Sequence, residues 1–168
     1  MAKGRAWVYG DDIDTDLMAP SAYLMKSGHE VVQHCMEAVD PSFAKSVDEG
    51  DVFVAGKNLG VGSSREQAPQ NLQALGIRYV LAESFGRIFY RNALNLGLPA
   101  LVCAETHRIS QGDELKIDAL SGRVENLTSG ETLRCEPLPA HLVDMIKDGG
   151  LIPHLEKKLA KERQANAY

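Results

Sequence analysis

The stretch DVFVAGKNLGVGSSREQ, residues 51–67, decides the fold class of this chain. Residues 52–55 form a compact apolar run of valine, phenylalanine and alanine, which is typical of a strand. Residues 66–75 carry the periodicity of a helix, and a glycine-rich turn joins the two. A strand, a turn and a helix in this order indicate an α/β architecture.

The same alternation continues on both sides of this stretch. Apolar runs predict strands at residues 5–9, 52–55, 79–82 and 100–103. Segments of helical period predict helices at residues 30–39, 66–75 and 87–96. Gly76 and Gly97 fall where helix C-caps are expected, and Pro99 stops the last of these helices from continuing.

The pattern changes after residue 113. Residues 113–136 alternate apolar and polar side chains around two Ser-Gly pairs, which predicts a meander of hairpin-linked strands. The remainder is helical with a break at Gly149, Gly150 and Pro153, and a charged helix is expected from about residue 151. Because no linker separates these parts, we expect residues 1–168 to form a single domain.

The composition narrows the range of functions. The chain has 168 residues, of which 44% are apolar, and its formal net charge of −5 is spread along the sequence. This charge indicates neither a nucleic-acid partner nor an anionic membrane surface. The first residues lack the apolar core of a secretory signal, and no apolar stretch approaches ~18 residues. We therefore expect a cytoplasmic protein without a membrane span.

The cysteines are odd in number and far apart: Cys35, Cys103 and Cys135. This distribution suits reduced thiols in the core better than a disulfide framework. It also lacks the close spacing of a metal-binding or iron–sulfur motif, so no metal ligand is assigned in this chain.

Five residues of the opening stretch follow the predicted strand at its carboxyl end: Gly60, Gly62, Ser63, Ser64 and Arg65. Open α/β sheets bind ligands at this edge. Free N–H groups at a helix start attract anions, Gly62 lets a ligand come close to the backbone, and Arg65 offers a planar fork for a carboxylate. The predicted ligand is an acid. The alternative is that Ser63 or Ser64 caps the helix while Arg65 is solvated.

A second unusual segment is GDDIDTDLMAPSAYL, residues 10–24, which places four aspartates within six residues. It lacks the glycine and the terminal glutamate of an EF-hand, which argues against calcium. Aspartate is also an ordinary turn and capping residue, and we favour that role for Asp11 and Asp12.

Three motifs occur together in this chain: DIDTD at 12–16, GVGSSRE at 60–66 and ESFGRIFYRNALNLGLPAL at 83–101. In combination and order they closely resemble the small subunits of 3-isopropylmalate dehydratase, in the aconitase family, over nearly the whole chain. The resemblance implies a swivelling β/β/α three-layer domain with a mixed sheet. It also implies a hydro-lyase that interconverts 2-isopropylmalate and 3-isopropylmalate through a dehydrated intermediate, in leucine biosynthesis.

The same resemblance implies a division of labour between two chains. The partner is a large subunit that binds a [4Fe-4S] cluster through its own cysteines, and this chain is inactive alone. The substrate is a small hydroxy dicarboxylic acid. The sequence leaves open the identity of the large subunit and whether the isolated chain self-associates.

Residue roles carried over from the family centre on the GSSRE element. Ser63 resembles the catalytic base, while Ser64 and Arg65 resemble groups that bind the substrate carboxylate. Positive potential from the helix start and Arg65 would stabilise the charged form of the Ser63 hydroxyl. Thr15 and Asp16 match active-site positions that orient the substrate or the arginine.

The loop SAYLMKSG, residues 21–28, is expected to set substrate specificity. Family members that act on tricarboxylic acids present an arginine just after the Tyr-Leu pair, whereas this chain has Met25. A substrate isopropyl group beside methionine gains apolar burial, whereas an unpaired carboxylate there is costly to desolvate. Lys26 complicates this expectation, because it offers a cation nearby. A homoaconitase, a 2,3-dimethylmalate dehydratase and a non-catalytic carboxylate-binding module remain alternatives.

Overall fold

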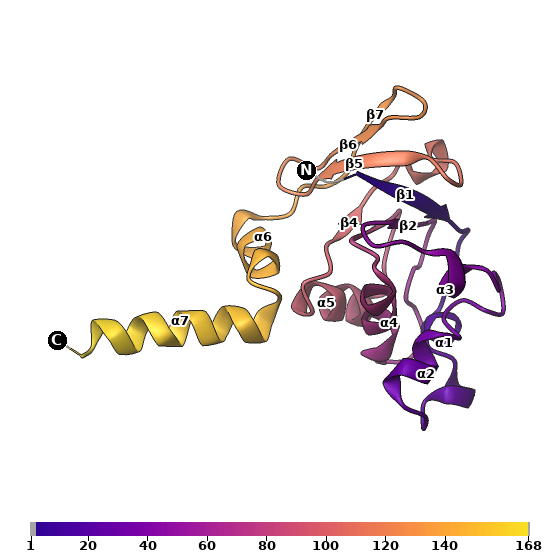
Figure 1. Cartoon of the computed structure of the whole chain (residues 1–168). Coiled ribbons are helices and arrows are strands. Elements are labelled where there is room, and N and C mark those ends of the chain that lie inside the picture. Colours follow the sequence, from indigo (N-terminus) through magenta and orange to yellow (C-terminus); the bar gives the residue numbers. More distant parts are fainter. Residues whose placement is uncertain (1–2, 168) are drawn as a thin grey trace.

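The computed structural model describes residues 3–167 and contains a seven-stranded sheet with helices packed against it (Figure 1). The strand order is β4-β3-β2-β1-β5-β6-β7. The strands are β1 (Lys3–Val8), β2 (Val52–Ala55), β3 (Tyr79–Ala82), β4 (Ala100–Val102), β5 (Glu114–Asp118), β6 (Arg123–Asn126) and β7 (Thr132–Arg134). Strands β1 to β4 pair in parallel and β5 to β7 pair antiparallel, so the sheet is mixed, as the sequence predicted.

Strand β1 belongs to both halves of the sheet. Its first residues, Lys3 to Arg5, pair antiparallel with β5, and its last residues, Ala6 to Val8, pair in parallel with β2. The buried carboxylate of Asp51 fixes this junction, because it accepts hydrogen bonds from the Arg5 backbone N–H at 3.1 Å and from the Trp7 indole N–H at 2.9 Å. A buried carboxylate that is satisfied in this way holds β1 in register against the start of β2.

The sheet curls until the segment after β7 meets the opposite edge strand. The Glu136 N–H donates to the carbonyl of Val102 at 2.8 Å, and the Cys103 thiol donates to the carbonyl of Arg134 at 3.6 Å. The buried side chains form one core cluster to which strands from both halves contribute. All three cysteines lie in this core.

Helices pack on the parallel half of the sheet, and the last helix projects away from the body (Figure 1). The α-helices are α1 (Thr15–Met18), α2 (Gly28–Val32), α3 (Phe43–Ser46), α4 (Gln67–Leu75), α5 (Arg87–Asn95), α6 (Ala140–Lys147) and α7 (Leu151–Ala165). Two 3₁₀ turns, η1 (Ser21–Tyr23) and η2 (Thr106–Arg108), complete the elements. None of the described helices is both long and apolar enough to cross a membrane.

The predicted helix at residues 30–39 is wrong over most of its length. Helix α2 ends at Val32, and turns follow in which Met36 has a φ of +65°. The N–H of Met36 donates to the carbonyl of Leu17 at 2.8 Å, and its side chain is fully buried. A tertiary contact with α1 therefore replaces the helical hydrogen bonds that the periodicity predicted.

The predicted break before the C-terminal helix is confirmed at Gly149 and Gly150, which separate α6 from α7. Pro153 does not break the chain. It lies in the first turn of α7, where the missing N–H would have had no helical partner.

Candidate active site

Parallel pairing of β1 with β2 places the loops that follow these strands side by side. Val8 pairs with Val54 at the carboxyl end of both strands. The two loops then continue the contact through backbone hydrogen bonds, from Gly60 N–H to the Ile13 carbonyl at 2.7 Å and from Thr15 N–H to the Val61 carbonyl at 3.0 Å. The two sequence motifs that contain Thr15 and Ser63 thus meet at one edge of the sheet.

Three of the four clustered aspartates hold these loops in shape. Asp11 accepts from the Lys57 backbone N–H at 2.7 Å, and Asp12 accepts from the Asn58 side-chain amide at 2.9 Å. Asp14 is the N-cap of α1 and accepts from the Leu17 N–H at 2.9 Å. Within residues 3–167, no group of three or more His, Cys, Asp or Glu side chains could hold a metal ion.

Thr15 holds Ser63 through two contacts. The Ser63 backbone N–H donates to Thr15 Oγ1 at 3.1 Å, and the two hydroxyl oxygens lie 3.2 Å apart. Thr15 is 2% exposed whereas Ser63 is exposed, so a rigid, buried residue positions an accessible hydroxyl. If Thr15 Oγ1 accepts from the amide, its own proton is available to donate to Ser63 Oγ.

Glycine is required on the loop that carries Ser63. Gly60 and Gly62 have φ values of +83° and +114°, which disfavour residues with a side chain. A Cβ on Gly60 would overlap the Phe89 ring, and a Cβ on Gly62 would lie 3.0 Å from Thr15 Oγ1. The loop can therefore approach both α5 and Thr15 closely.

Arg65 forms an ion pair with Asp16. Its Nη1 donates to Asp16 Oδ1 at 2.9 Å and to the carbonyl of Ala19 at 3.2 Å. Hydrogen bonds from Arg65, and then from Ser21, hold the pKa of Asp16 below its usual value, so the carboxylate stays ionised at neutral pH. Both Arg65 contacts use Nη1, which leaves Nη2 and Nε without a hydrogen-bond partner among the described residues.

Neither serine caps helix α4. Its N-cap residue is Glu66, and no side chain makes a capping hydrogen bond there. Ser63 bonds to Thr15 instead, and Ser64 is exposed. The capping alternative is therefore wrong, and in the first turn of α4 the Ala68 N–H donates to the Arg65 carbonyl at 3.4 Å.

The structure does not bring Met25 to this cluster. Its side chain is 98% exposed, in the loop between η1 and α2. Lys26 next to it places its Nζ 5.6 Å from the centre of the Tyr23 ring, and that ring stacks on His34. In the described conformation Lys26 therefore rests on Tyr23.

Sequence reasoning missed one residue that supports the site. Asn71 on α4 is buried, and its side-chain amide donates to the carbonyl of Met18 at 3.0 Å. This contact ties α4 to the end of α1 and so fixes the loop of Arg65 relative to that of Asp16. A polar residue next to Leu72 on the apolar face of the helix was the available signal.

Comparisons with known proteins identify the family of this chain. The aconitase C-terminal domain family matches residues 12–106. An isopropylmalate/citramalate isomerase small subunit from Methanocaldococcus jannaschii is 45% identical over 163 residues, which is 96% of this chain and 97% of that protein. A 3-isopropylmalate dehydratase small subunit from Methanosarcina acetivorans is 47% identical over 162 residues, or 96% of this chain and 99% of that protein.

A solved structure extends the similarity to the fold. The crystal structure of a 3-isopropylmalate dehydratase from Methanocaldococcus jannaschii superposes with a TM-score of 0.89 at 42% sequence identity. The match covers 96% of this chain and 98% of that chain. The expected α/β fold of the family is thereby confirmed.

Replacement of Thr15 by valine should release Ser63 while preserving the shape of the buried side chain. We expect the Ser63 amide hydrogen to exchange with solvent about fivefold faster, since one hydrogen bond contributes about 1 kcal/mol. Thr15→Ser retains the oxygen and serves as the control. Hydrogen exchange followed by NMR measures both variants, and equal rates in Thr15→Val and the unsubstituted chain would contradict the positioning role.

Proposed function

The chain belongs to the aconitase family, among the small subunits of 3-isopropylmalate dehydratase, and we propose from this membership that it forms one half of that enzyme's active site. The enzyme is a hydro-lyase of leucine biosynthesis that interconverts 2-isopropylmalate and 3-isopropylmalate by removing and re-adding water. The observation that carries the proposal for this chain's residues is the convergence of Ser63, Thr15, Arg65 and Asp16 at one sheet edge.

We assign Ser63 as the base of the dehydration. Loss of water takes a proton from the carbon next to a carboxylate, and Ser63 Oγ receives that proton in this assignment. A serine oxygen accepts a proton well only when its charged form is stabilised. Thr15 supports this role, because its hydroxyl lies 3.2 Å from Ser63 Oγ and can donate a hydrogen bond to it. Rehydration then delivers a proton to the carbon that lost the hydroxyl group and a hydroxyl group to the carbon that lost the proton, so that the two groups exchange positions.

We assign Arg65 to the substrate carboxylate. Asp16 and the Ala19 carbonyl hold its Nη1, so the guanidinium is oriented before any ligand arrives. Its other donors, Nη2 and Nε, suit a planar contact with a carboxylate. Ser64 and the backbone at Gly62 are exposed and precede Arg65 on the same loop, and we assign them to the same carboxylate site.

The pairing of Arg65 with Asp16 changes the electrostatic picture drawn from sequence. The pair has no net charge, so Arg65 alone does not make the site positive. The start of α4 adds only part of the remaining positive potential, because the Ala68 N–H already donates to the Arg65 carbonyl at 3.4 Å and Pro69 has no N–H, which leaves the Gln67 N–H. Exclusion of water by a second subunit would strengthen both interactions.

We propose that a large subunit covers this face of the chain and carries the [4Fe-4S] cluster. Ser63 and Ser64 are exposed here, although the proposed chemistry requires an enclosed site. The assignment of the cluster to the partner rests on membership of the aconitase family. We further propose that the two chains assemble as a heterodimer in the cytoplasm.

Ser63→Ala should nearly abolish turnover in the enzyme reconstituted with its large subunit. We expect kcat to fall by at least about 100-fold, because the proton acceptor is removed, whereas assembly should be unchanged. Anaerobic turnover assays and size-exclusion chromatography measure the two effects. Ser110→Ala, at an exposed serine in the loop between η2 and β5, is the control. Turnover within a few-fold of the unsubstituted enzyme would remove Ser63 from the mechanism.

Met25 is proposed to face the substrate only when the large subunit closes the site. The exposure of its side chain is consistent with this proposal, because covering an apolar side chain that is 98% exposed lowers the free energy. Lys26 lies over the Tyr23 ring in the isolated chain, and we assign Met25 as the neighbour of the substrate side group. No observation favours the homoaconitase, the 2,3-dimethylmalate dehydratase or the non-catalytic module over the isopropylmalate enzyme.

Met25→Arg should shift the reconstituted enzyme toward hydroxy acids that have a third carboxylate. We expect the ratio of kcat/KM for isopropylmalate to that for homoaconitate to fall by about tenfold or more, because the new cation pairs with the extra charge. Competition assays with both acids give this ratio. Lys26→Ala tests whether the neighbouring cation affects this ratio. An unchanged ratio in Met25→Arg would refute the assignment of specificity to Met25.

A further inference from the structure

Helix α7 leaves an apolar stripe uncovered. Leu151, Leu155 and Leu159 recur every four residues, and Ile152 lies beside them on the same side of the helix. Leu151 packs against the core, but Ile152, Leu155 and Leu159 are 64%, 43% and 52% exposed. The stripe therefore begins on the body and continues beyond it, where none of residues 3–167 covers it.

The direction of α7 is fixed at its base. The Asp148 carboxylate accepts hydrogen bonds from His154 Nδ1 at 2.7 Å and from Lys157 Nζ at 2.8 Å. Gly150 also packs closely on the carbonyl of Asn95 at the end of α5. A helix of this length, about 22 Å, is only marginally stable in water unless its side packs against other residues. A partner that covers the projecting turns would therefore stabilise them.

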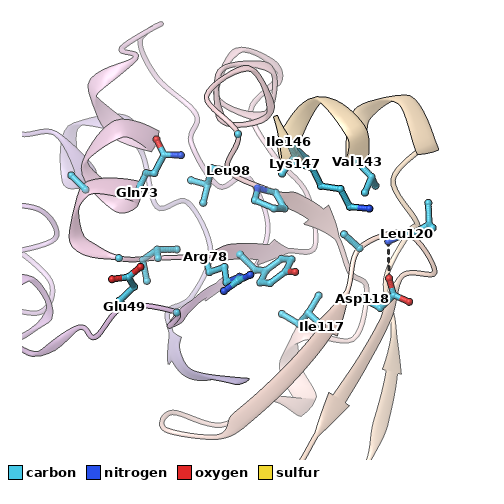
Figure 2. Close-up of a pocket in the computed structure, with 18 residues that line it drawn as sticks. Glu49, Gln73, Arg78, Leu98, Ile117, Asp118, Leu120, Val143, Ile146 and Lys147 are labelled. Carbon is cyan, nitrogen blue, oxygen red and sulfur yellow. Dashed lines mark hydrogen bonds between the residues drawn. The ribbon is translucent and has the colours of Figure 1, made fainter. Parts of the chain in front are cut away.

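A cavity of about 890 Å³ lies close to the base of α7, at the amino ends of the parallel strands. Figure 2 shows Val143 and Ile146 of α6 on one side and Glu49 and Gln73 on the other, with Leu98 between them. Its apolar wall consists of Ile77, Leu98, Ile117, Leu120, Val143 and Ile146. Leu120 on its rim is 53% exposed. Ile77, Leu98 and Ile117 are already buried, so Leu120, Val143 and Ile146 provide the accessible apolar surface for the α7 stripe.

We propose that two copies of this chain exchange their α7 helices, so that Ile152, Leu155 and Leu159 of each copy pack into the cavity of the other. Each copy supplies one stripe and one cavity. Two reciprocal contacts related by a two-fold axis therefore cover both stripes and fill both cavities. The proposal does not depend on the assignment of Ser63 or Arg65.

Charge favours a second copy as the occupant. Helix α7 carries four basic and two acidic side chains, a net charge of +2, so the rest of the chain, whose total is −5, carries −7. A basic helix is therefore attracted to the acidic body of another copy. The cavity lining itself is balanced, with Glu49 and Asp118 against Arg78 and Lys147, so this attraction comes from the body as a whole.

The position of the cavity also favours a second copy over the large subunit. The cavity is formed at the amino ends of β2, β3 and β4, whereas Ser63 and Arg65 follow the carboxyl end of β2. A dimer through α7 leaves the proposed catalytic face free. Each copy can then bind its own large subunit, which gives a dimer of the heterodimers proposed above.

Sedimentation of the full chain at micromolar concentration tests the proposal, and a dimer is expected. The double variant Leu155→Lys/Leu159→Lys should raise the dimer dissociation constant by about 100-fold or more, because the lysines would be buried without partners. Ala160→Lys/Gln164→Lys adds the same charge to the opposite, exposed face of α7 and should leave the dimer intact. A monomeric unsubstituted chain, or a dimer that survives Leu155→Lys/Leu159→Lys, would overturn the proposal.

A second pair of variants tests the cavity. Leu120→Lys should weaken the dimer as the helix variants do, whereas Leu127→Lys, on the β6–β7 turn outside the cavity, should not. A mixture of Leu155→Cys and Leu120→Cys chains should give a covalent dimer on mild oxidation. Cross-linking of Leu155→Cys alone without the mixed product would indicate helix-on-helix pairing and refute the cavity as the docking site.

Discussion

Parallel pairing between β1 and β2 is the constraint on which the rest of the structure depends. It places two loops that are far apart in the sequence side by side and lets them exchange backbone hydrogen bonds. The Asp51 carboxylate fixes one end of this pairing, and the contact between Thr15 and Ser63 lies at the other. The accessible hydroxyl is therefore positioned by the core of the sheet, and a loop that would otherwise be mobile becomes part of a rigid site.

The electrostatics of the site follow from a pair of charges. Asp16 orients Arg65 and offsets its charge, so the guanidinium acts as a directed donor more than as a source of positive potential. An exposed pair of this kind contributes little to stability, and its orientation matters once water is excluded. The isolated chain leaves Ser63 and Ser64 open to solvent. In this account the side chains are already oriented in the isolated chain, and the site becomes active when a second subunit closes it and excludes water.

The elements with strong local signals could be predicted from the sequence. Strands β2 and β3 were predicted to the residue, because both are short apolar runs bounded by turn residues. The helix predicted at residues 30–39 failed, since the burial of Met36 against α1 is a tertiary effect that periodicity does not record. The motifs indicated which loops carry the site. They did not reveal that Arg65 pairs with Asp16 or that Asn71 ties α4 to α1, because both contacts join distant parts of the chain.

The two ends of the parallel strands have different surfaces. The carboxyl ends carry the proposed catalytic groups, and the amino ends carry an apolar cavity beside a projecting helix. The central claim concerns the first of these surfaces, and a structure of the assembled two-subunit enzyme with a bound hydroxy diacid tests it most directly. The account predicts that Ser63 Oγ lies within about 3.5 Å of the carbon that loses the proton, with Arg65 on the adjacent carboxylate. A diacid held elsewhere, with Ser63 still bonded only to Thr15, would contradict it.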